Sequence, residues 1–367
     1  MPVAPSDAIA WVKGRDVAGR TAVGLDIGTS GVRAAELSSS RGSQVLERFG
    51  QVALPTGAVR DGEVVDVETV AAALRQLWAS ARFSTKRVVL GVANQRVIVR
   101  QVDLPWLPPG EMRKSLPFQV QDFIPIPVDQ AVLDFHPLEE FTNESGGRML
   151  RMLLVAADRD MVNGALRAVQ QAKLIPAMVD LTPFALLRSL TAPGIRGDDA
   201  EADAYVNVGA SITNIVIHQG GVPRFVRILV MGGNDVTDAV SERLGVSIEQ
   251  AEAVKAQVGM PSISDSSDPA GRVIEQAGSQ WVEEVRGSLD YYAAQPGAAR
   301  LNKIVLTGGG SQLTGLAERL ANATRLMVEP AAPYSTLKLG KLGLTTEQLQ
   351  YVQPLVAVPV GLAMGVA

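Results

Sequence analysis

The chain has 367 residues, and its 34 Lys+Arg against 38 Asp+Glu give a net charge of −4 at neutral pH. This length predicts about two to three domains. Because 47% of the residues are hydrophobic and 20% charged, a wholly disordered chain is excluded. The mild acidity argues against a general nucleic-acid binder, which needs a basic face. With no cysteine and only two histidines, His136 and His218, the chain has no disulfide, thiolate metal site or His-rich metal centre.

A targeting or membrane segment would be expected at one of the two ends of the chain. Met1–Arg20 mixes apolar and charged residues and lacks the apolar core of a signal peptide, so we expect a flexible segment over residues 1–20. Tyr351–Ala367 is almost wholly apolar, which raises the alternative of a tail anchor. It is shorter than the roughly 20 residues of a membrane span and contains Pro354 and Pro359. We therefore expect a buried helix and no direct membrane span.

An internal repeat is the clearest feature of the sequence. Val23–Leu37 and Tyr205–Ile217, about half the chain apart, each read as a strand, a turn of small residues and a return strand. Aligned, they place Asp26 on Asn207 and Gly28 on Gly209. This pattern predicts a duplicated α/β domain whose halves both open with a β-hairpin.

Further elements follow each hairpin. A 3.6-residue apolar period predicts a helix over Val67–Arg82, and continuous apolar runs predict buried strands at Arg87–Val92 and Lys303–Thr307. A helix is expected from about Leu313, after the glycines that end the second of these strands.

Residues 97–173 interrupt the alternation and read as strand, helix, two strands and helix, which predicts an inserted subdomain. Pro117 lies inside its first helix and predicts a break or kink there. Residues 235–296 are mostly helical in pattern. The expected divisions are a flexible segment at 1–20, a first domain at 21–96 and 174–197, the inserted subdomain at 97–173, a second domain at 204–237 and 301–367, and a helical nucleotide-side subdomain at 238–300.

The turn of the first hairpin, Gly28–Gly31, gathers backbone N–H groups and two hydroxyls into a concavity that suits phosphate. Asp26 at the strand end could orient Mg²⁺ through its waters, and Arg33 on the return strand could reach phosphate oxygens. Either turn alone is also typical of a plain tight hairpin. The repeat favours two turns that face each other and clamp one phosphate chain.

Two more glycine turns follow strands. Gly308, Gly309 and Gly310 would let a flat ring or sugar approach the backbone, and a helix after Ser311 would favour anions. Gly232 and Gly233 form the other turn, and the helix after it carries Glu252 and Lys255 one turn apart. That pair by itself reads as a surface ion pair. The chain has neither a P-loop nor a Rossmann fingerprint.

In this order, the two hairpin turns and the glycines at 308–310 resemble the phosphate and adenosine motifs of the actin-like ATPase superfamily. Leu181–Leu187 and Pro359–Ala363 resemble its two connecting helices. Arg100–Pro108, Gln121–Pro127 and Val132–Phe135 narrow the resemblance to the PilM family of type IV pilus assembly proteins. The resemblance implies duplicated actin-like (ribonuclease H-like) α/β domains, a nucleotide cleft between them, and an FtsA-type relocated subdomain at the insertion.

The same resemblance implies that ATP and Mg²⁺ bind in the cleft, with Asp26 organising the metal through water. The residues implied for the phosphates are Gly28, Thr29, Ser30, Arg33, Gly209, Ala210 and Ser211. Those implied for the nucleoside side are Gly232, Gly233, Glu252, Lys255, Gly308, Gly309, Gly310 and Ser311. Because superfamily enzymes usually carry Asp where this chain has Asn207, we expect ATP binding with slow or undetectable hydrolysis.

For partners, the resemblance implies a cytoplasmic adaptor that binds the short N-terminal cytoplasmic tail of PilN. It would lie at the inner membrane through this partner and couple the PilN/PilO complex to the pilus motor, with the motor ATPases as further candidates. One alternative is a sugar or acetate kinase, which needs a carboxylate base in the cleft. The other is an FtsA-like division protein, which would carry a basic amphipathic terminal helix. The sequence identifies neither feature.

Overall fold

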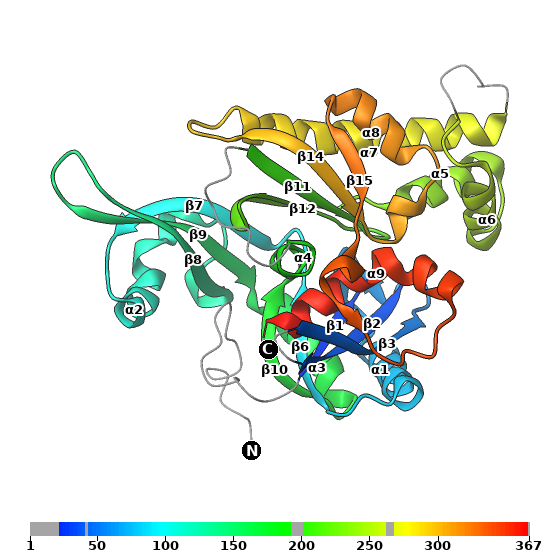
Figure 1. Ribbon diagram of the computed structural model, residues 1–367, viewed down its shortest axis with the longest axis horizontal. Helices are drawn as coiled ribbons and strands as arrows, with labels where there is room; N and C mark the ends of the chain where they lie inside the picture. The colour runs from blue at the N-terminus through cyan, green and yellow to red at the C-terminus, as the bar shows by residue number, and fades with distance from the viewer. Residues whose placement is uncertain (1–21, 41–42, 192–200, 262–267, 366–367) are drawn as a thin grey trace.

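The computed structural model describes residues 22–40, 43–191, 201–261 and 268–365, so the expected segment at 1–20 lies outside it. Its two halves are built on two large sheets (Figure 1). The six-stranded sheet has the order β10-β6-β1-β2-β3-β16, and the five-stranded sheet β13-β12-β11-β14-β15. The strands of the first are β1 (Val23–Ile27), β2 (Gly31–Ser40), β3 (Ser43–Ala53), β6 (Arg87–Val92), β10 (Ile175–Leu181) and β16 (Lys338–Leu339). Those of the second are β11 (Glu201–Val208), β12 (Thr213–Gln219), β13 (Val222–Leu229), β14 (Arg300–Thr307) and β15 (Met327–Pro330).

Both sheets follow the same path. In each, three antiparallel strands are followed by two that run parallel to the first, which is the ribonuclease H-like order. The registers also correspond, because Asp26 faces Arg33 on β2 and Asn207 faces Asn214 on β12. The predicted duplicated, actin-like α/β fold is confirmed.

Helices cover both sheets. Those packed on the first are α1 (Val67–Ala81), α3 (Arg159–Gln171), α4 (Thr182–Leu190) and α9 (Thr346–Met364); those of the second half are α5 (Gly233–Leu244), α6 (Ile248–Val258), α7 (Pro269–Ala293) and α8 (Leu316–Thr324). α1 forms as its apolar period predicts. Asp66 caps it by accepting the N–H of Thr69 at 3.0 Å, and its buried face includes Leu74 and Leu77.

Helix α9 packs very closely on both α4 and β1 because glycines lie at these contacts. A Cβ on Gly361 would be 1.8 Å from the carbonyl oxygen of Ala185, and one on Gly24 would be 1.9 Å from that of Pro359. Arg188 donates to the Gly361 carbonyl at 2.9 Å. The apolar C-terminal segment is therefore a buried helix, as expected. In the part of the chain that the structure describes, no helix is long and apolar enough to cross a membrane.

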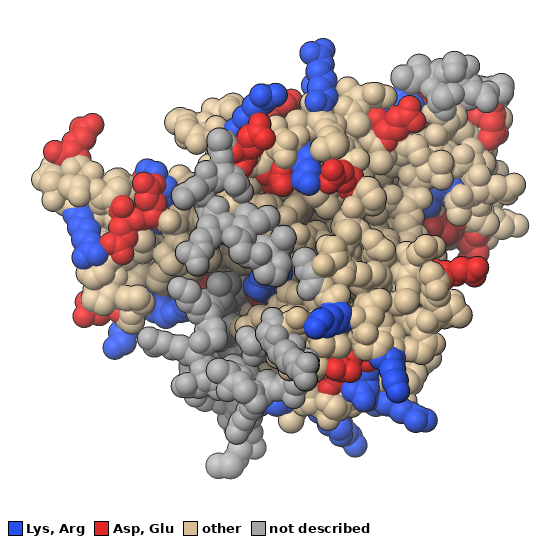
Figure 2. All heavy atoms as spheres, viewed as in Figure 1, with Lys and Arg blue, Asp and Glu red and all other residues tan. Residues whose placement is uncertain are grey.

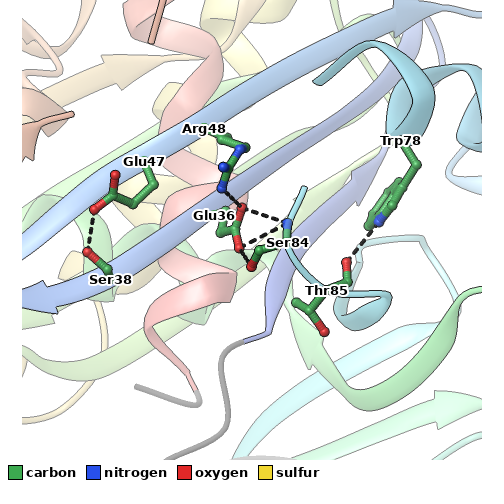
Figure 3. A network of polar contacts seen from close by, with 7 residues as sticks. All are labelled: Glu36, Ser38, Glu47, Arg48, Trp78, Ser84 and Thr85. Carbon is green, nitrogen blue, oxygen red and sulfur yellow. Dashed lines mark hydrogen bonds and ion pairs between the residues drawn. The ribbon is translucent and has the colours of Figure 1, made fainter. Parts of the chain in front are cut away.

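A buried carboxylate fastens the loop after α1 to the first sheet (Figure 3). Glu36 on β2 is 3% exposed and accepts from Arg48 on β3 at 2.8 Å. It also accepts from the backbone N–H and the hydroxyl of Ser84. Trp78 donates to the carbonyl of Thr85 at 2.9 Å. These bonds fix the path from α1 into β6, the strand beside β1.

The inserted region forms a separate three-stranded sheet of order β7-β9-β8. Its elements are β7 (Val97–Pro105), α2 (Pro109–Gln119), β8 (Ala131–Thr142) and β9 (Arg148–Asp158). Their core includes Met112, Leu116, Phe135 and Met152. The β8–β9 hairpin projects from the molecule, at the left in Figure 1, and carries side chains of both signs in Figure 2.

Three details differ from expectation. α2 runs past Pro117 to Gln119 before a 3-10 turn, rather than breaking at the proline. α3, expected within the insertion, packs in the core of the first half. No α-helix begins at Leu313: a 3-10 helix spans Gly309–Gln312, and α8 starts at Leu316 because Gly315 turns the chain at φ 84°.

Candidate functional site

The two hairpin turns close with the same backbone bond. Gly28 donates to the carbonyl of Gly31 at 3.0 Å, and Gly209 donates to that of Ile212 at 2.9 Å. Both turns line one cleft of about 1220 Å³ between the halves. A cleft of this size, lined by two such turns, has room for a ligand with several phosphates.

The first turn carries a carboxylate beside a cation. Asp26 and Arg33 are each about one-fifth exposed, and their charged atoms lie 3.9 Å apart. Arg33 also donates to the hydroxyl of Ser30 at 3.3 Å. Burial raises the pKa of Asp26, and the Arg33 guanidinium opposes that rise. Mg²⁺ would favour the ionised carboxylate for the same electrostatic reason.

The second turn is neutral where the first is charged. Asn207 stands at the position of Asp26, and Asn214 at that of Arg33, and both line the cleft. Asn214 is 3% exposed, and its side-chain oxygen has no hydrogen-bond partner among the described residues. Such an oxygen can accept a donor from a metal-bound water or a ligand. Sequence analysis did not name Asn214 as a site residue, although the aligned repeat segments already pair it with Arg33.

The start of α5 supports the second turn from behind. Gly233 donates to the carbonyl of Gly209 at 3.0 Å, and Asn234 donates to that of Ala210 at 2.7 Å. Gly232 leaves no room for a side chain, because a Cβ there would be 2.5 Å from the Gly209 carbonyl. Ser211 accepts from the Asn234 amide at 3.2 Å. The start of α5 thus fixes the turn, and Gly232 and Ser211 do not line the cleft.

The three glycines after β14 have different roles. Gly308 has φ 88°, and a Cβ on it would lie 2.4 Å from the Val208 carbonyl. A Cβ on Gly310 would be 2.6 Å from the Val208 side chain. At Gly309 the nearest atom, from Leu355, is 3.6 Å away, so this glycine alone leaves its space to the cleft. Ser311 donates to the Gly308 carbonyl at 2.6 Å and is not part of the lining.

Glu252 and Lys255 form a polar cluster on the cleft wall. They lie on α6, the second helix after the Gly232–Gly233 turn rather than the first as expected. Lys255 donates to Glu252 at 2.6 Å and to Thr237 at 2.8 Å, and Thr237 donates to Glu252 at 2.6 Å. Burial pushes the pKa of Glu252 up, but the bonds from Lys255 and Thr237 outweigh it and lower that pKa. These bonds hold a carboxylate and an ammonium group in fixed positions on the cleft wall.

The structure therefore gathers most of the predicted residues around one cavity. Those that line it are Asp26, Gly28, Thr29, Ser30, Arg33, Asn207, Gly209, Ala210, Gly233, Glu252, Lys255, Gly308, Gly309 and Gly310. Residues missed by sequence reasoning include Thr237 and Asp238 on α5. Within the described ranges, no group of three or more His, Asp or Glu side chains is placed to hold a metal ion directly.

Known proteins share both the sequence and the fold of this chain. The family model of the type IV pilus assembly protein PilM matches residues 24–366. The chain belongs to the PilM family. Among solved structures, a PilM-PilN type IV pilus biogenesis complex is 29% identical, covers 95% of this chain and 99% of that one, and superposes with a TM-score of 0.82. The ethanolamine utilization protein EutJ of Carboxydothermus hydrogenoformans, 16% identical with a TM-score of 0.54 over 95% and 94% of the chains, shares the fold.

Curated relatives of the PilM-family chain include the cell division protein FtsA. The Neisseria meningitidis protein is 24% identical over 348 residues, which cover 84% of this chain and 83% of that one. The Bacillus subtilis protein is 22% identical over 270 residues, or 67% of this chain but only 60% of that protein. These likenesses support the expected FtsA-like relationship of the chain.

Proposed function

We propose that this PilM-family protein is an ATP-binding adaptor of the type IV pilus machine that holds the N-terminal cytoplasmic tail of a PilN-type partner. The observation that carries the proposal is the match, over 95% of the chain, to the structure of a PilM-PilN type IV pilus biogenesis complex. The tail would hold the protein at the inner membrane, and through PilN it would be linked indirectly to PilO and the pilus motor.

The cleft fits Mg²⁺-ATP on three observations. Both hairpin turns line it, Gly309 leaves open space, and the buried side-chain oxygen of Asn214 has no donor among the described residues. The turns at Gly28–Ser30 and Gly209–Ala210 would hold phosphates, with Arg33 adding charge. Asp26 would orient Mg²⁺ through its waters, and the Glu252–Lys255 cluster would meet the ribose. The bound metal would supply charge neutralisation for the phosphates.

The neutral second turn favours binding over turnover. Asn207 can hydrogen-bond a metal-bound water, but it has no charge to offset Mg²⁺ and cannot act as a base. Losing one positioned charge typically costs about 10²–10³ in rate. We therefore propose slow or undetectable hydrolysis, with nucleotide occupancy setting the conformation of the cleft.

Gly309→Val tests the nucleotide site. Its side chain enters the cleft without meeting backbone, since a Cβ there has its nearest neighbour at 3.6 Å. The variant should fold normally and lose measurable ATP binding by calorimetry. Gly287→Val is the matched control, because a Cβ at Gly287 on α7 meets nothing within 4 Å and the residue lies outside the cleft. Unchanged ATP affinity in a folded Gly309→Val protein would remove the assignment.

Removal of the inserted unit tests the tail site. The chain enters and leaves this unit at neighbouring points, because Asp158 donates to the Arg96 carbonyl at 3.2 Å. A short glycine linker can therefore replace residues 97–157. The shortened protein should keep ATP affinity, which also shows that it folds, and should lose the PilN tail. Full tail affinity after this removal would place the groove elsewhere.

A further inference from the structure

A second hollow, of about 650 Å³, lies at the end of the first sheet that points away from the cleft. β3 spans the two sites, because Ala53 at its end lines the cleft and Val45 near its start lines the hollow. The last turn of α1 and the segment after β16 form the other walls. Among the described residues, none that lines the hollow also lines the cleft or belongs to the inserted unit. The hollow is therefore a separate candidate site.

Three cationic side chains from three separate segments line this hollow. Arg48 comes from β3, Arg82 follows the last residue of α1, and Lys341 lies just after β16. Arg48 donates to the buried carboxylate of Glu36 at 2.8 Å (Figure 3). Arg82 and Lys341 are both exposed, and within the described ranges neither has an ion-pair partner. Figure 2 shows Lys and Arg side chains gathered at the lower right, over α1 and β3. Two of the three cations are therefore available to an anion.

The backbone holds these cations at fixed positions. The N–H of Arg82 donates to the carbonyl of Trp78 at 3.2 Å, which closes the end of α1. The N–H of Gly340 donates to the carbonyl of Leu46 at 2.9 Å and ties the segment that carries Lys341 to β3. Because these segments are fastened to one sheet, their charges meet at the hollow without a rearrangement of the chain.

The remaining lining suits an anion that carries an apolar part. Val45, Phe49 and Leu342 contribute apolar surface to the hollow. Glu47 is the single carboxylate in the described lining, and the hydroxyl of Ser38 donates to it at 2.6 Å. Cations therefore outnumber carboxylates here, although the whole chain has a net charge of −4. A phosphate group joined to a hydrocarbon part would use both the cations and the apolar surface.

We propose that the hollow binds the phosphate headgroup of an anionic membrane phospholipid, such as phosphatidylglycerol. Arg82 and Lys341 donate to the phosphate oxygens, and Arg48 adds its charge from β3. Val45 and Leu342 contact the glycerol and the first methylene groups. The choice of a membrane lipid over a soluble phosphate ester rests on the proposed function, in which the PilN tail brings the protein to the inner membrane. The lipid is a contact additional to that tail, and it sets which face of the first half meets the membrane.

The charges give the size of the expected effect. Each Lys or Arg near an anionic membrane surface strengthens binding by a factor of about five. Replacing Arg82 and Lys341 together should therefore weaken vesicle binding about 25-fold. Arg48 is kept in the test variants, because its removal would leave the Glu36 carboxylate buried without its cation.

The experiment measures co-sedimentation of the full-length protein with vesicles of phosphatidylcholine, alone or mixed equally with phosphatidylglycerol. The natural protein should bind the mixed vesicles only, and more weakly at high salt. Arg82→Gln combined with Lys341→Gln should lose about 25-fold in vesicle affinity. Lys173→Gln combined with Arg243→Gln is the matched control, because both residues are exposed and lie outside the hollow. Lys173, at φ 60°, also matches the backbone of Arg82 at φ 53°. The control should bind like the natural protein, and urea denaturation checks that both variants fold.

Undiminished vesicle binding by the Arg82→Gln, Lys341→Gln variant, or an equal loss in the control, would overturn the inference. Failure of the natural protein to bind the mixed vesicles would do the same. Calorimetry with soluble glycerol phosphate distinguishes the two sources of a phosphate group, and binding of this ester without vesicle binding would overturn the assignment to a lipid. The vesicle assay contains no PilN tail, so its failure is distinct from a failed tail titration, which would contradict the proposed function.

Discussion

Replacing Asp134 by Asn should make the protein more stable at neutral pH, although it removes a charge that Arg113 contacts. Burial raises the pKa of this carboxyl from 3.8 to about 6. The folded state therefore binds the proton more tightly than the unfolded chain, and the ionised group opposes folding above about pH 6. A difference of about two pKa units corresponds to about 3 kcal/mol. Asparagine resembles the protonated acid, so it should recover an energy of that order.

Because the pKa of Asp134 is higher in the folded state, the stability difference between Asp134→Asn and the natural protein should depend on pH. Above about pH 6, Asp134→Asn should unfold at higher urea concentration than the natural protein. As the pH falls from 6 towards 3.8, the natural carboxyl takes up its proton and the difference should shrink towards zero. Urea denaturation at several pH values measures the difference, and hydrogen exchange of β8 localises it. A variant that is less stable at pH 7.5, by an amount independent of pH, would refute this reasoning.

Three further predictions concern the cleft and the helices beneath it. Asn207→Asp should raise the rate of single-turnover ATP hydrolysis by a factor of up to about 10²–10³ without weakening ATP binding. Fast turnover by the natural protein that the substitution leaves unchanged would contradict the role given to Asn207. Burial raises the pKa of Asp26, so acidification should protonate this carboxylate and lower the Mg²⁺-dependent affinity for ATP. Calorimetry of Asp26→Asn should show that the ATP affinity no longer depends on pH in this way. Gly361→Ala should lower the free energy of unfolding by about 1–3 kcal/mol in urea denaturation, since its Cβ would lie 1.8 Å from the Ala185 carbonyl; an unchanged midpoint would mean that α4 and α9 separate freely.

Local patterns predicted the two hairpin turns because their chemistry lies within a few residues. The bond from Gly28 to Gly31 and its equivalent from Gly209 to Ile212 both close inside a segment that the repeat alignment identifies. The apolar residues that predict α1 also recur within one short segment of the chain. These features positioned most of the cleft without any knowledge of tertiary contacts.

Features set by distant contacts escaped prediction. Only the approach of Val208 shows that Gly308 and Gly310 serve packing while Gly309 faces the cleft. The helix expected at Leu313 begins later because Gly315 adopts φ 84° against Met260, far away in the sequence. The burial of Asp134 likewise depends on how one face of β8, with Val132 in the core of the first half, packs against that half. No periodicity in Val132–Phe135 reveals this contact.

Binding of the PilN tail to the full-length protein loaded with Mg²⁺-ATP tests the central proposal most directly. Calorimetry should show saturable one-to-one binding, and replacing residues 97–157 with a short linker should abolish it while ATP affinity is kept. Absence of tail binding by the ATP-loaded natural protein would contradict the account.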